Sequence, residues 1–211
     1  MKKIYIYIRL IAILSICMAI PSLTNAQTIP NGYINIDWQL SSPFGNDFAN
    51  KISGWGAQAE AGYYITEGLA VGAFVSFHTN NKYIDRATIQ INETSAVTSD
   101  QQHSIFQIPF GAALRYSFMR DREGIFEPYV GAKIGTAYSE VSSYMNIFKT
   151  YERKWGFYVS PEIGLTVYTN PMKTFGFHVA AYYSYATNKS SVLSYSVDGL
   201  NNWGIRLGIA F

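Results

Sequence analysis

The chain has 211 residues, of which 16% are aromatic and 14% are charged, and it contains 17 tyrosines and one cysteine. A chain of this length forms about one domain, and a lone Cys17 excludes an internal disulfide and any cysteine-based metal site. The formal net charge of +2 is too small for a nucleic-acid footprint, so we expect no nucleic-acid partner.

The first 26 residues have the pattern of a cleaved signal peptide. Three basic residues precede an uncharged apolar run from residue 10 to residue 20, and Thr24-Asn25-Ala26 supplies the small residues of a cleavage site. The run is too short for a spanning helix. Lipidation at Cys17 is a minor alternative, because bulky Ile16 precedes it. Cleavage removes three of the 16 basic residues and none of the 14 acidic ones, so the exported domain, residues 27–211, has 13 basic and 14 acidic residues.

Eight segments of this domain alternate apolar and polar residues with a period of two, which predicts β-strands with two different faces. The expected strands are Ile34–Leu40, Trp55–Ile65, Leu69–Phe77, Phe106–Phe118, Phe126–Tyr138, Trp155–Val167, Phe175–Tyr185 and Trp203–Phe211. We expect no helix beyond the leader.

Short and long connections alternate between these segments. Three short links contain Gly, Pro, Asn or Asp and predict tight turns, at residues 66–68, 120–124 and 170–173. Four longer polar stretches are expected to be loops, at residues 41–53, 79–102, 139–154 and 187–202. Tight turns on one rim and long loops on the other are typical of outer-membrane barrels.

Glycine placement indicates which face points inward. Eleven of the 17 glycines lie on the polar face of the expected strands and none on the apolar face. Glycine weakens a water-facing strand, whereas the narrow interior of an eight-stranded barrel accommodates small side chains. We therefore expect the apolar face to contact lipid, in an all-β, eight-stranded antiparallel up-and-down transmembrane β-barrel. The alternative is a soluble sandwich or lipocalin-type barrel. Large aromatics near the segment ends fit interfacial belts: Trp38, Trp55, Tyr63, Phe118, Trp155, Tyr185 and Trp203.

Three stretches, Phe126–Ser139, Tyr63–Phe77 and Asn201–Phe211, resemble the OmpA/OmpX-like family of small outer-membrane β-barrels, and the resemblance covers essentially the whole exported domain. It implies a monomer in the lipid bilayer of the cell outer membrane. It also implies that the barrel-assembly machinery reads the terminal Phe211 as its signal. The sequence ends at the barrel, without the periplasmic domain of OmpA, so cell-wall tethering is not implied.

Charged residues on the inward face are candidate site residues, because charges in a low-dielectric interior must be paired. We expect a lumen charge network formed by Asp37, Glu60, Arg115, Lys133, Glu162 and Arg206. The alternative reading is a gated ion path in which Arg115, Lys133 or Arg206 exchanges carboxylate partners.

The histidines give little support for an enzyme. His78 and His178 share the inward parity, but neither has an inward nucleophile beside it, and His103 and Ser104 point to opposite faces. Their spacing also gives no metal motif. We expect no catalytic residue, cofactor or metal, and a role in envelope integrity or in surface interaction with an unidentified extracellular ligand. The long loops would act through Tyr144, Phe148, Tyr151 and Tyr195. A narrow pore for ions or small solutes is the second hypothesis, and a lipid A-modifying enzyme is the third.

Overall fold

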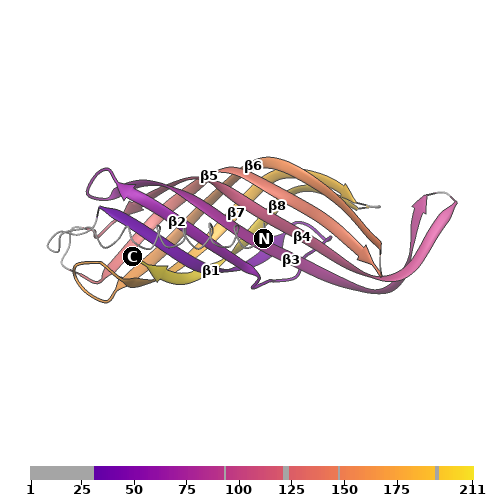
Figure 1. The fold of residues 1–211 in the computed structure, drawn as a ribbon, viewed down its shortest axis with the longest axis horizontal. Helices are drawn as coiled ribbons and strands as arrows, with labels where there is room; N and C mark the ends of the chain where they lie inside the picture. The colour runs from indigo at the N-terminus through magenta and orange to yellow at the C-terminus, as the bar shows by residue number, and fades with distance from the viewer. Residues whose placement is uncertain (1–30, 93, 121–123, 147, 193–194) are drawn as a thin grey trace, which may run out of the picture.

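The computed structural model describes residues 31–92, 94–120, 124–146, 148–192 and 195–211. Eight strands form a closed antiparallel barrel in which each strand pairs with its sequence neighbours and the last pairs with the first (Figure 1). The strands are β1 (Gly32–Phe44), β2 (Gly56–Tyr64), β3 (Leu69–Asn92), β4 (Ser95–Ser117), β5 (Phe126–Met145), β6 (Phe148–Tyr168), β7 (Gly176–Val192) and β8 (Tyr195–Ala210). The expected fold class is confirmed.

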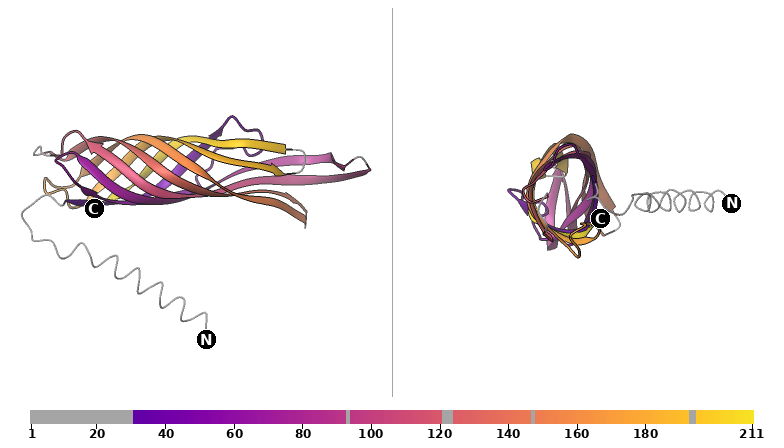
Figure 2. Two further views of the ribbon diagram at one scale, coloured as in Figure 1. Left: turned by 90° about the horizontal axis from the view of Figure 1, so that it is seen from above. Right: turned by 90° about the vertical axis from the view of Figure 1, so that its left-hand side faces the viewer.

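The first and last strands close the ring, which Figure 2 shows end-on. Ile36 pairs with Ile209 in the β1–β8 ladder, and Phe211 exchanges backbone hydrogen bonds of 2.8 and 2.9 Å with Ile34. The expected signal peptide lies outside the described residues.

Within the described residues, no helix is long and apolar enough to cross a membrane.

Three of the four long polar stretches expected to be loops are mostly strand. β3 and β4 form a hairpin that passes beyond all the others, and β5–β6 and β7–β8 form shorter ones (Figures 1 and 2). Polar cross-strand pairs continue the ladders: the hydroxyls of Thr88 and Thr98 are 2.8 Å apart. An antiparallel ladder requires backbone pairing and compatible side-chain pairs, not an apolar face. Alternation in the sequence therefore revealed only the lipid-facing part of each strand.

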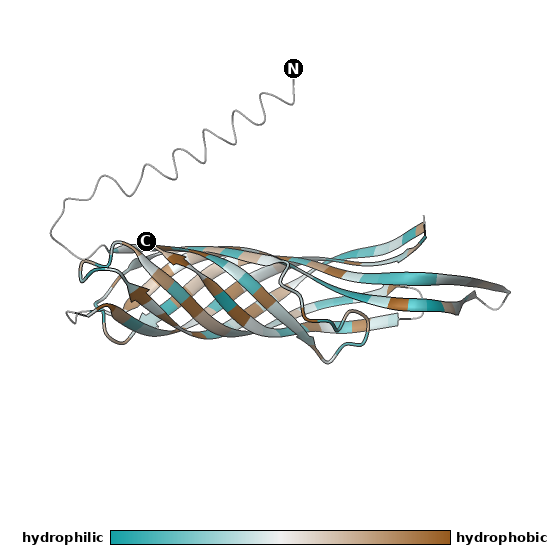
Figure 3. Ribbon diagram, turned by 90° about the horizontal axis from the view of Figure 1, so that it is seen from below, coloured by the Kyte–Doolittle hydropathy of each residue, from teal (hydrophilic) through white to brown (hydrophobic). Residues whose placement is uncertain are grey.

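Hydrophobic and hydrophilic residues alternate along the strands of the barrel (Figure 3), and the two faces of its wall have opposite polarity. Apolar side chains such as Ile36, Leu114 and Ile163 are exposed on the outside, whereas the buried inward positions are largely polar or charged. An apolar surface of this extent is unusual for a protein in water. It fits the hydrocarbon core of a bilayer, where a closed barrel leaves no unpaired strand edge.

Aromatic side chains lie at both rims of this apolar surface. Trp55, Trp155 and Trp203 are exposed toward the hairpin end, and Tyr63 and Phe118 toward the short-turn end. Amphipathic rings favour the interface between headgroups and hydrocarbon. The two sets therefore fit the boundaries of a membrane-spanning band.

Inward-facing glycines allow neighbouring strands to approach closely. A Cβ atom on Gly204 would lie 1.9 Å from the carbonyl oxygen of Leu40, and one on Gly135 would lie 2.1 Å from that of Phe110. Such contacts are with backbone, so a side chain there requires the wall itself to move. The glycines on the inward face thus have two steric causes: the close approach of neighbouring strands, and the small volume of the interior.

We predict that Gly204→Ala lowers the free energy of unfolding by about 1–3 kcal/mol, the usual cost of overpacking. Gly124→Ala is the control, because nothing lies within 4 Å of its new Cβ. The measurement is urea unfolding of each variant in lipid vesicles, with folding checked by the heat-dependent shift on a detergent gel. Equal stability of the two variants would contradict the steric explanation.

Candidate functional site in the barrel interior

A chain of ion pairs crosses the centre of the barrel. The Arg115 Nη2 atom donates to Glu60 Oε1 at 3.0 Å, and Lys133 Nζ lies 2.7 Å from Glu60 Oε2. Lys133 also pairs with Glu162, which in turn pairs with Arg206. These five buried side chains come from β2, β4, β5, β6 and β8. The network therefore joins strands that are not neighbours in the sheet.

Tyrosine rings surround the arginines of this network. The Arg115 guanidinium lies between the rings of Tyr33 and Tyr129, at 4.1 and 3.9 Å from their centroids. The Arg206 guanidinium lies 3.9 Å from the centroid of Tyr182. Stacking on an aromatic face stabilises a guanidinium that has lost its water. These tyrosines were not among the predicted site residues. In the sequence they have the same parity as the inward-facing charges, and this parity could have identified them as lumen residues.

Asp37 joins the network through a histidine and a tyrosine. Its Oδ1 atom is 2.6 Å from His178 Nδ1, and His178 Nε2 is 2.6 Å from the Tyr129 hydroxyl, which donates to Glu162 Oε1 at 3.1 Å. A base oriented by an acid beside a hydroxyl is an arrangement found in nucleophilic catalysis. Here Asp37, His178 and Tyr129 are at most 3% exposed, so a substrate would reach them only if the packed interior opened.

All six predicted lumen residues thus lie in one connected network. Three are acidic and three are basic, so the formal charges balance: Asp37, Glu60 and Glu162 against Arg115, Lys133 and Arg206. Removing a charge from water is costly, and pairing with good geometry offsets that cost. The arrangement can hold the lumen closed; its use as an ion path stays a prediction.

Apolar side chains close the interior on the hairpin side. The β1–β2 loop places Phe48 and Ala49 at 2% and 0% exposure. The Phe48 ring stacks on His103, with centroids 4.1 Å apart and planes 9° apart. The same cluster includes Ile105, Val141, Val192, Val197 and Leu200. The sequence predicts this loop as a polar connection and gives no indication that Phe48 is buried, because an isolated aromatic residue in a loop is not part of a periodic pattern.

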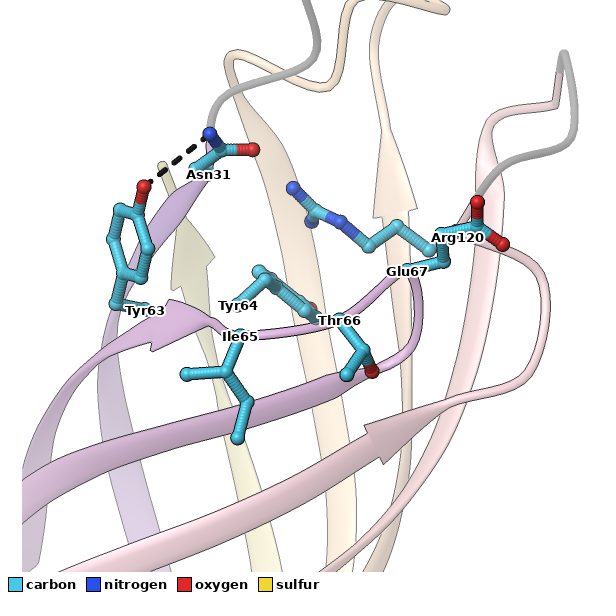
Figure 4. A pocket seen from close by; sticks show the side chains of 7 residues that line it. All are labelled: Asn31, Tyr63, Tyr64, Ile65, Thr66, Glu67 and Arg120. Carbon is cyan, nitrogen blue, oxygen red and sulfur yellow. Dashed lines mark hydrogen bonds between the residues drawn. The ribbon is translucent and has the colours of Figure 1, made fainter.

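The short-turn end holds a further ion pair and a pocket. Lys173 Nζ lies 3.0 Å from Glu127 Oε2, and the Tyr64 hydroxyl donates to Glu127 Oε1 at 2.8 Å. The Arg120 side chain lies across the Tyr64 ring, 3.4 Å from its centroid. The adjoining pocket has a volume of about 610 Å³ (Figure 4) and is lined by Asn31, Tyr63, Tyr64, Ile65, Thr66, Glu67 and Arg120.

His78, a further buried histidine, forms polar contacts of its own. His78 Nδ1 lies 3.3 Å from Gln39 Nε2, and His78 Nε2 lies 3.4 Å from Asn202 Nδ2. In the part of the chain that the structure describes, no three His, Cys, Asp or Glu side chains gather as metal ligands.

A closed antiparallel ring, an apolar outer face, a filled polar interior, and tight turns opposite long hairpins together define an outer-membrane β-barrel. The chain belongs to the family of the outer membrane protein beta-barrel domain, whose model matches residues 10–211. The expected resemblance to small outer-membrane barrels is therefore confirmed, and with it the outer membrane as the location.

The chain is similar to solved structures of other outer-membrane proteins. Neisserial surface protein A is 15% identical with a TM-score of 0.54, over 86% of this chain and 96% of that one. OprG from Pseudomonas aeruginosa is 14% identical with a TM-score of 0.49, over 87% and 96%. Ail of Yersinia pestis is 15% identical with a TM-score of 0.41, over 85% and 97%. No curated protein sequence matches the chain. The match to Neisserial surface protein A shows a common fold and, at this identity, no more.

We predict that Glu162→Gln lowers the free energy of unfolding by about 3–5 kcal/mol, because it leaves buried Lys133 and Arg206 without a shared carboxylate. Adding Lys133→Met to the same protein removes the cation left in excess, because Lys133 then shares only Glu60 with Arg115. The double variant should recover part of the loss. Urea unfolding in lipid vesicles measures both.

The control for this prediction is Glu152→Gln, whose ion pair with Lys154 is solvent-exposed. An exposed pair contributes little, so its unfolding curve should coincide with that of the unmodified protein. A Glu162→Gln protein as stable as the control would show that the lumen charges do not hold the barrel together.

Proposed function

We propose that this protein is a non-enzymatic barrel that acts at the cell surface through its extracellular hairpins, in surface interaction or envelope integrity. The supporting observation is the filled lumen. Arg206, Lys133, Tyr129 and Tyr158 are each at most 1% exposed, and the Phe48 cluster covers the hairpin side. An eight-stranded barrel has an interior just wide enough for such side chains, so the residues left to act on the surroundings are outside.

The hairpins carry exposed aromatics beside charges. On the outward face of β5–β6, Tyr144 and Tyr151 are 40% and 50% exposed. Lys149 Nζ lies 5.2 and 5.0 Å from their ring centroids, and it donates to Glu140 Oε1 at 2.5 Å. This hydrogen bond holds the pKa of Glu140 below its usual range. Aromatic anchors flanked by charged groups are frequent in protein interfaces.

We predict that the folded protein conducts no current in a planar bilayer, since water has no continuous path through a lumen filled by side chains. The measurement is single-channel recording on protein shown by its gel shift to be folded. Steady, ion-selective current steps would favour the narrow pore over surface interaction. In parallel, expression of the protein should leave the lipid A mass spectrum of its host unchanged, and a new lipid A species would favour the enzyme hypothesis.

We also predict that the function depends on the β3–β4 hairpin. Residues 85–100 are replaced by an Asn-Gly turn that joins Ile84 to Gln101, which already pair across the ladder. The barrel should keep its gel shift and unfolding midpoint. The host should lose the adherence or detergent resistance that the full chain confers on a deletion strain. If the truncated protein confers the same phenotype as the full chain, the hairpin is not the functional element.

A further inference from the structure

The β3–β4 hairpin leaves the barrel as a two-stranded ribbon (Figure 2). β4 pairs with β5 as far as Gln102 and Tyr144, and β5 turns back into β6 after Met145. On the other side, β3 pairs with β2 as far as His78. Beyond these points the ribbon has sheet edges, which present backbone N–H and C=O groups that another strand can bind.

The β3 edge of the ribbon is protected. The register shifts between Ile84 and Ala87, so that Asp85 and Arg86 form a bulge with two exposed charges. Nearer the barrel, Lys82 Nζ donates to the carbonyl oxygen of Asp47 at 2.6 Å, and the β1–β2 loop thereby lies against β3. Bulges and charges on an edge both oppose strand addition.

The β4 edge has no bulge and carries a single charge. The residues that bulge out of the hairpin ladder are on β3, so β4 itself continues without an insertion, with Thr98 opposite Thr88 and Ser99 opposite Ala87. From Ser95 to Gln101 the sequence contains one charged residue, Asp100. Among the described residues, no strand pairs with this stretch on its side away from β3. Seven residues of regular strand edge are thus exposed near the tip of the hairpin, far from the barrel.

We propose that this β4 edge, residues 95–101, binds the same edge of a second copy in a facing membrane, as an antiparallel strand pair. The inference rests on the proposed surface function and names its partner. A second copy carries the same edge, whose one charge lies away from the axis. Two identical antiparallel strands are related by a two-fold axis, which makes the contact self-complementary.

The direction of β4 relative to the bilayer determines which two copies can form an antiparallel pair. In two copies that share one bilayer, the β4 strands run in the same direction away from the membrane, so their edges could pair only as parallel strands. Copies in two opposed bilayers direct β4 oppositely, and the hairpin that extends furthest meets its counterpart first (Figure 1). With the axis at Thr98, Asp100 faces Ala96 of the second copy, so like charges are not opposed. Many weak contacts between two membranes act together.

Cysteine cross-linking tests the contact directly, because Cys17 in the expected leader is the chain's one cysteine. Thr98→Cys is placed in both of two differently labelled vesicle populations. In a second combination, Ala96→Cys is placed in one population and Asp100→Cys in the other, because these two residues face each other across the proposed axis. Residues opposite each other across an antiparallel pair have Cβ atoms about 4.5–5.5 Å apart, close to disulfide geometry. Mild oxidation should give disulfide dimers that join the two labels and separate on reduction. Thr88→Cys, on the protected edge, should give none.

A charge test needs no cross-link. Thr98→Lys places two like charges opposite each other near the axis and should reduce vesicle clustering about fivefold. Thr88→Lys adds the same charge to the facing strand of the same pair and should leave clustering unchanged. Both variants must keep the gel shift of the folded barrel.

The absence of dimers both from Thr98→Cys and from the combination of Ala96→Cys with Asp100→Cys, or equal dimers from Thr88→Cys, would overturn the proposal. The outcome is distinct from that of the proposed function. If hairpin truncation abolishes the host phenotype but no β4 dimers form, the surface function stands and its partner is not a second copy. If dimers form but truncation leaves the phenotype intact, the contact exists and the proposed function fails.

Discussion

The pairing of charges across a closed lumen is the interaction on which the rest of the structure depends. Lipid outside requires a sheet without edges, and closing eight strands leaves a narrow interior. Polar side chains directed inward then have little water to bind. Glu60, Glu162 and their cationic partners satisfy one another instead, and tyrosine rings fill the space around them. The wall and its contents therefore stabilise each other.

The sequence predicted the membrane-spanning half of the strands, the orientation of their two faces, and the six charged residues of the lumen. Each follows from a period of two together with the placement of glycine, both of which are local properties. The contacts inside the lumen are not local. Asp37 and His178 are 141 residues apart, and their distance depends on strand tilt and stagger, which alternation does not encode. Tyr33 and Tyr129 were identifiable by parity, but aromatic residues were read as lipid-facing.

The prediction that the long polar stretches are loops was wrong for three of the four, because only segments with alternating apolar and polar residues were predicted as strands. Alternation arises where one face meets lipid and the other a polar lumen. In the β3–β4 hairpin both faces are largely polar, so pairs such as Thr88–Thr98 continue the ladder without any alternation of apolar and polar residues. The burial of Phe48 was missed for a related reason. Its contacts with His103 exist only because three hairpins surround the mouth.

The same constraint explains where the molecule can interact. Within the membrane every strand has two partners, so no backbone edge is available there. The ring ends where β4 parts from β5 at Gln102, and from that point a sheet edge exists again. Charges and a bulge at Asp85 and Arg86 protect one side of the ribbon. The other side of the ribbon, the β4 edge, is therefore the place at which backbone N–H and C=O groups can pair with another strand.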